Sequence, residues 1–92
     1  KKMDAGKKQL AGQRCYLNLV EREHTLTEKE MELAQSMYDR DSILYARNAM
    51  IVAEFEESGS RYLQSLRTRE TSGMSLLQAE MQLKQQEENL LD

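Results

Sequence analysis

The 92-residue sequence contains no proline and no tryptophan, and it has only one cysteine and one phenylalanine. A chain of this length that folded with many turns would carry several prolines, so their absence permits nearly uninterrupted helix. A hydrophobic share of 39% leaves little material for a globular core. The composition therefore favours an all-α rod, in which only about two residues in seven have to be apolar.

Long apolar runs are also absent. No stretch approaches the roughly 20 apolar residues that span a bilayer, and there is no signal-peptide pattern, so we expect no membrane span. The single thiol, Cys15, cannot form an intramolecular disulfide and fits a reducing compartment, either cytoplasm or nucleus. The net charge of −3 is too small to indicate a partner.

The sequence does contain a heptad repeat, which runs from Met3 to the end without a skip. Apolar residues hold most a positions up to Leu66, and leucine fills the d positions of the last three heptads. Such a stripe has to be buried against another helix. We therefore predict one long, nearly continuous helix that forms a coiled coil. The predicted self-association seam consists of Leu10, Leu17, Val20, His24, Met31, Ala34, Tyr38, Tyr45, Asn48, Val52, Phe55, Tyr62, Leu66, Leu76, Leu83 and Leu90.

A parallel homodimer is the favoured form of this coiled coil. Parallel pairing in register places Tyr38 against Tyr38 and Asn48 against Asn48, which matches large with large and polar with polar. The charges of the two ends, +4 over residues 1–14 and −3 over residues 80–92, would instead favour antiparallel pairing at low salt. Antiparallel pairing and a helical hairpin or bundle therefore stay as alternatives.

Four segments follow from composition. Residues 1–12 are basic, contain two glycines and should fray, and we expect the native helix to continue upstream of Lys1. Residues 13–57 form the main coiled-coil segment. Residues 58–75 contain glycine and serine and should be weak points in the helix, and residues 76–92 form a C-terminal coiled-coil segment with an acidic end.

Two Gly- and Ser-containing stretches, at 58–60 and 71–75, are the candidate breaks. The heptad phase passes through both without a shift, although a hairpin loop has no need to preserve phase. We therefore interpret them as flexible points within one helix, with a hairpin that folds at 58–60 as the alternative.

Two features depart from a simple two-stranded seam. Leucine recurs at three c positions, Leu19, Leu26 and Leu33, where a two-stranded coiled coil faces solvent, so this stripe predicts a third helix or a partner. Asp41 lies at a d position, where a buried carboxylate needs a donor. The hydroxyls of Tyr38 and Tyr45 are the local candidates.

The sequence contains few residues in patterns typical of catalytic or metal-binding sites. Glu21 and His24 have the Glu-x-x-His spacing of di-iron bundles, but this is the only histidine and such a site needs several more ligands. No histidine lies near Cys15, and no phosphate-binding glycine loop is present. We therefore expect no enzyme activity, no metal site and no cofactor.

Function is predicted only as a class. We expect a coiled-coil dimerisation or scaffold segment of a larger intracellular protein, which binds itself and presents its faces to other proteins. The alternative is a helical-bundle adaptor that docks a partner through Leu19, Leu26 and Leu33. A second alternative is a nucleic-acid-associated helix, although no aromatic residues are interleaved with its basic residues to support base stacking. It would use the basic residues Lys1, Lys2, Lys7, Lys8 and Arg14.

Overall fold

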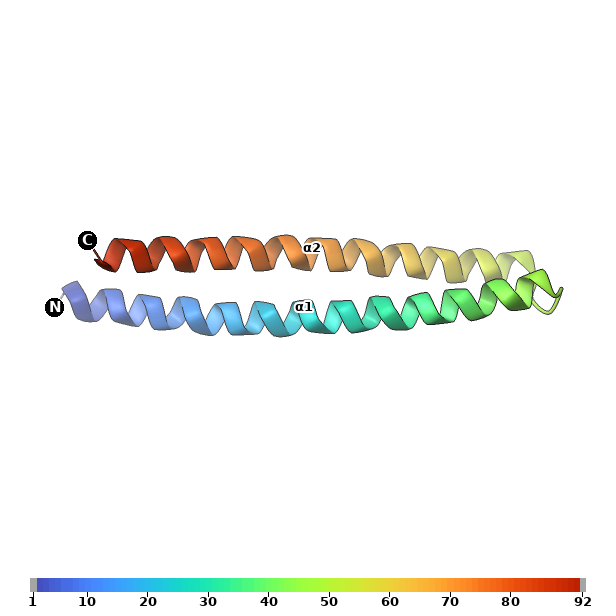
Figure 1. The fold of residues 1–92 in the computed structure, drawn as a ribbon, viewed down its shortest axis with the longest axis horizontal. Helices are drawn as coiled ribbons and strands as arrows, with labels where there is room; N and C mark the ends of the chain where they lie inside the picture. Colours follow the sequence, from blue (N-terminus) through green and yellow to red (C-terminus); the bar gives the residue numbers. More distant parts are fainter. Residues whose placement is uncertain (1, 92) are drawn as a thin grey trace.

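The protein is all-helical and consists of two long helices. The structure is a computed structural model that describes the backbone of residues 2–91 and the side chains of residues 5–90; Lys1 and Asp92 lie outside the described residues. Helix α1 spans Lys2–Ala46 and helix α2 spans Val52–Leu91. The two helices lie side by side and antiparallel, with both chain ends at one end of the rod (Figure 1). The hairpin measures 70 × 15 × 14 Å.

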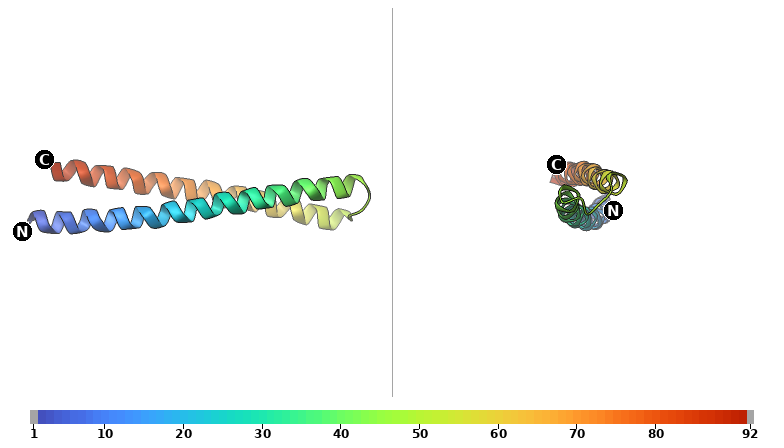
Figure 2. Two further views of the ribbon diagram at one scale, coloured as in Figure 1. Left: turned by 60° about the horizontal axis from the view of Figure 1, so that its bottom comes forward. Right: turned by 90° about the vertical axis from the view of Figure 1, so that its right-hand side faces the viewer.

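The helices cross one another along the rod, as paired helices with a heptad repeat do (Figure 2). The long dimension matches a straight 45-residue helix, which rises about 1.5 Å per residue. Neither helix is long and apolar enough, over residues 2–91, to cross a membrane.

The expected single continuous helix is wrong, because the chain reverses direction at residues 47–51. The reversal does not occur at either predicted break, since α2 runs unbroken through residues 58–60 and 71–75. Instead the chain turns at Asn48, whose φ of 58° lies in the left-handed region. Asparagine adopts this conformation more easily than any other residue type except glycine.

The turn at Asn48 is a Schellman motif that caps the last carbonyl groups of α1. The Ala49 N–H donates to the Leu44 carbonyl at 2.8 Å, and the Asn48 N–H donates to the Tyr45 carbonyl at 3.0 Å. Helix α2 then begins with the Phe55 N–H donating to the Ile51 carbonyl at 3.1 Å. Asn48, predicted to lie in the seam, is therefore an exposed capping residue.

The a and d positions of α1 face α2 of the same chain. In α2 the residues that face α1 include the g positions as well as most a and d positions. Most predicted seam residues are partly buried in this contact, whereas Tyr45 and Val52 are 38% and 51% exposed. The inward g positions of α2 carry small side chains at every seventh residue: Ser58, Ser65, Ser72 and Ala79.

Four aromatic rings stack at the turn end of the hairpin. Tyr38 stacks on Phe55 and Tyr62, with ring centroids 5.5 and 5.4 Å apart, and Tyr45 stacks on Phe55 at 4.7 Å. The column alternates between α1 and α2, so it fixes the register of the two helices next to the turn.

Two glycines of α2 make room for large side chains of α1. A Cβ atom at Gly59 would lie 3.3 Å from the Tyr38 ring, and one at Gly73 would lie 3.4 Å from the His24 ring. Both glycines are helical, so their role here is close packing rather than chain reversal.

The core between two helices is thin. Ala79 is the one apolar residue that is fully buried among the described side chains, and no large side chain is less than 2% exposed there. A helix can cover only one face of its neighbour, so the other faces stay in contact with solvent. The hairpin therefore has apolar surface left over.

The role of Asn48 can be tested with two substitutions. Asn48→Leu should lower the free energy of unfolding by about 1 kcal/mol, because leucine is strained at positive φ. Asn48→Gly should leave stability at or slightly above that of the wild type. Urea-induced unfolding followed by circular dichroism measures both. Stabilisation by leucine would show that residue 48 is a buried seam position instead.

Candidate protein-docking face

A line of three leucines runs along the outer side of α1. Leu19, Leu26 and Leu33 are 58%, 56% and 64% exposed, and each lies seven residues from the next. We call these three residues the leucine ridge. Their spacing places them on one side of the helix, next to the side that faces α2.

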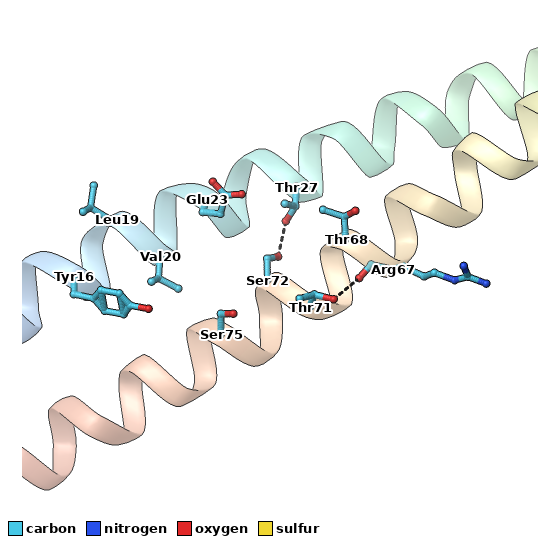
Figure 3. A pocket seen from close by; sticks show the side chains of 10 residues that line it. All are labelled: Tyr16, Leu19, Val20, Glu23, Thr27, Arg67, Thr68, Thr71, Ser72 and Ser75. Carbon is cyan, nitrogen blue, oxygen red and sulfur yellow. Dashed lines mark hydrogen bonds between the residues drawn. The ribbon is translucent and has the colours of Figure 1, made fainter.

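A groove lies beside the ridge, between the two helices (Figure 3). Its volume is about 510 Å³. Tyr16, Leu19 and Val20 form its wall on α1, and small polar residues such as Thr68 and Ser75 form its wall on α2. Arg67 also lines the groove from α2. The ridge and groove together are the docking face discussed below.

The docking face continues toward the turn. A second hollow, of about 230 Å³, is lined on α1 by Leu33, Ala34 and Met37. Ser58 and Arg61 line it from α2. Leu33 of the leucine ridge therefore borders this second hollow, as Leu19 borders the first.

A buried polar layer forms the floor of the groove. Thr27 and Ser72 are 3% and 8% exposed, and their hydroxyl oxygens lie 2.7 Å apart (Figure 3). His24 Nδ1 lies 2.8 Å from the same Ser72 oxygen, and His24 Nε2 lies 2.8 Å from Glu28 Oε1. Four buried or half-buried polar residues, three from α1 and Ser72 from α2, are thus joined in one network.

The hydrogens of this network follow from its geometry. The Glu28 carboxylate can only accept, so Nε2 of His24 carries a hydrogen. The Thr27 hydroxyl donates to the His24 carbonyl at 2.7 Å, and the Ser72 hydroxyl donates to the Arg69 carbonyl at 2.9 Å. The short contacts of Ser72 with His24 and Thr27 cross from α2 to α1, so the layer specifies which α1 residue faces which α2 residue.

Asp41 lies two heptads beyond Thr27 and is 6% exposed. Its Oδ1 atom has no hydrogen bond, although Arg40 Nε lies 3.5 Å away. The expected donation from the Tyr38 and Tyr45 hydroxyls is absent at this atom. A buried carboxylate oxygen without a hydrogen bond costs stability.

The remaining sequence-predicted sites are not brought together. Glu21 is exposed, while both nitrogens of His24 are occupied by Ser72 and Glu28. Over the described residues no group of three His, Cys, Asp or Glu side chains gathers. Cys15 is exposed.

The basic residues Lys7, Lys8 and Arg14 lie at the open end of the hairpin, where Arg14 is 3.8 Å from Glu87. The side chains of Lys1 and Lys2 lie outside the described residues.

The sequence identified the leucine ridge but not the α2 side of the docking face. Thr68, Ser72 and Ser75 carry no signal of their own, since serine and threonine are frequent on exposed helix surfaces. Thr68 and Ser75 lie at c positions, whereas for Ser72 the available signal was a repeat of small residues at the g positions. It becomes informative only once the antiparallel pairing of the helices is known.

No protein-family model, no curated protein and no solved structure matches this chain.

The polar layer can be tested at Ser72. Ser72→Ala leaves His24 Nδ1 without its partner. Ser75→Ala is the control, because Ser75 is an exposed groove residue that makes no hydrogen bond in the described part of the chain. Ser72→Ala should be less stable than Ser75→Ala by about 1 kcal/mol in urea unfolding. Equal stabilities would show that the layer does not contribute to holding the hairpin.

Proposed function

We propose that this chain is a protein-association module. Its hairpin is a rigid rod that presents the docking face to a helix of another polypeptide. The observation that carries the proposal is the exposure of Leu19, Leu26 and Leu33 along one line. Isolated exposed leucines are ordinary, but three at heptad spacing beside a groove are what a helix partner requires.

The packing of the a/d seam supports the docking face, rather than the seam, as the binding surface. In the hairpin the seam packs against the chain's own second helix, so self-association through it would require the hairpin to open. The docking face is available without any unfolding. A scaffold role, in which the rod joins other domains or proteins, then follows from the length of the hairpin, 70 Å.

The thin core gives a second argument. With no large side chain fully buried among the described residues, the hairpin gains stability from any helix that covers the ridge. A bundle of three or four helices gives each helix two neighbours, and widened apolar faces are typical of such bundles.

Photo-crosslinking tests this function. A benzophenone amino acid replaces Tyr16, which keeps an aromatic ring in the groove, or replaces the exposed Glu21, which does not line this groove. The labelled chain is irradiated in an extract of the cells that make it, and adducts are identified by mass spectrometry. We expect a defined adduct from position 16 and none from position 21.

The ridge itself supplies the control. Adding Leu26→Gln to the position-16 probe should abolish the adduct, because a polar side chain at the centre of the ridge removes apolar contact. Adducts that form equally from both positions, or that persist with glutamine at 26, would contradict the proposal.

A further inference from the structure

The leucine ridge has an acidic flank on the side of the groove. Glu23 and Glu30 each lie four residues after a ridge leucine. On a helix this spacing places both carboxylates beside the ridge and on the same side of it. Glu23 lines the groove and Glu30 lines the second hollow, so this flank is the one that faces α2.

The opposite flank of the ridge is basic. Arg22 and Lys29 each lie three residues after a ridge leucine, which places them on the side away from the groove. Arg22 lines a separate hollow with Leu26, and every residue that lines this hollow belongs to α1. Glu21 lines it too, but a residue two positions after Leu19 does not lie beside that leucine. The ridge therefore separates a line of negative charge from a line of positive charge.

None of these four flank charges is neutralised within the hairpin. The ion pairs found over residues 5–90 include none of Arg22, Glu23, Lys29 and Glu30. No ion pair joins the two walls of the groove in this part of the chain, since Arg61 on the α2 wall makes its ion pair within α2. All four flank residues are exposed. Charges on the two sides of an apolar line are the groups with which paired helices select a partner and its direction.

The two flanks constrain what can cover the ridge. Two helices that run parallel bring opposite flanks together, whereas two that run antiparallel bring the same flank of each together. In either direction the occupant needs basic residues against Glu23 and Glu30, and acidic residues against Arg22 and Lys29. A helix with two acidic or two basic flanks brings like charges together on one side of the ridge.

We propose that the occupant of the docking face is a helix of another polypeptide, with apolar residues at heptad spacing between one acidic and one basic flank. This inference rests on the proposed function and adds the chemistry of the partner to it. The charges also set the direction of the partner helix. A partner with its charged flanks arranged as in α1 runs parallel to α1, and one with the flanks exchanged runs antiparallel.

Two synthetic helical peptides test this assignment. Each has three heptads with leucine along one line. The first carries glutamate and lysine on the same flanks as α1, and the second has these flanks exchanged. A maleimide at one end of the peptide reports its direction by reacting with native Cys15, which is exposed and lies four residues before Leu19. We expect the first peptide to react from its N-terminal end and the second from its C-terminal end.

The two peptides have the same composition, so burial of leucine alone gives no reason for their directions to differ. The variant Cys15→Ser is the control for reaction elsewhere on the chain. Equal reaction from both ends, or the same direction for both peptides, would overturn the proposal.

A charge exchange in the protein is the second test. Glu23→Lys with Glu30→Lys makes both flanks basic, so the dissociation constant of the first peptide, measured by fluorescence anisotropy, should rise on the order of tenfold. Adding Arg22→Glu with Lys29→Glu restores one acidic and one basic flank. The affinity should then return close to the wild-type value while the direction of the peptide reverses. Circular dichroism checks that both variants keep their helices, and a four-residue variant of wild-type helicity that does not regain binding would contradict the proposal.

The native partner gives the last test. The adduct from position 16 should map to a helix of another protein that carries one acidic and one basic flank. An adduct helix with a different charge pattern would overturn this inference and leave the proposed function intact, whereas the absence of any adduct contradicts the proposed function itself. A dimer of the chain alone in sedimentation equilibrium that is lost with Leu26→Gln would identify a second copy as the occupant, and would also overturn this inference.

Discussion

The structure depends on the burial of the α1 seam. A heptad stripe of apolar side chains cannot stay in water, and the chain covers it with its own second half. To cover its own seam the chain has to reverse direction sharply, and Asn48 at positive φ allows this reversal. The length of the rod, the antiparallel register and the free outer faces all follow from that reversal.

The contact between the helices changes in character along the rod. Stacked aromatic rings hold the turn end, and the hydroxyl and imidazole groups of Thr27, Ser72 and His24 join the helices near the middle. Hydrogen-bonded layers discriminate between registers better than apolar ones, since a slip leaves polar groups without partners. Asp41 is the exception, because its buried Oδ1 atom has no hydrogen bond.

Much of α1 could be predicted from the sequence, because the heptad period reports which side of a helix is buried. The leucine ridge was predicted for the same reason. The turn was not, since residues 47–51 reverse the chain without shifting the heptad phase, and Asn48 occupies what looks like a d position. The inward g positions of α2 were also missed. Serine carries no hydrophobic signal, and its burial at 58 and 72 depends on how closely the helices approach.

The central claim is that one chain covers its own seam. It is tested most directly by the distance between the two arms within a single molecule. Spin labels on native Cys15 and on Lys84→Cys, diluted in excess unlabelled protein, report that distance by double electron–electron resonance. Two adjacent antiparallel helices predict a separation within about 30 Å, whereas one continuous helix predicts about 100 Å. A distribution centred near the longer distance would contradict the hairpin.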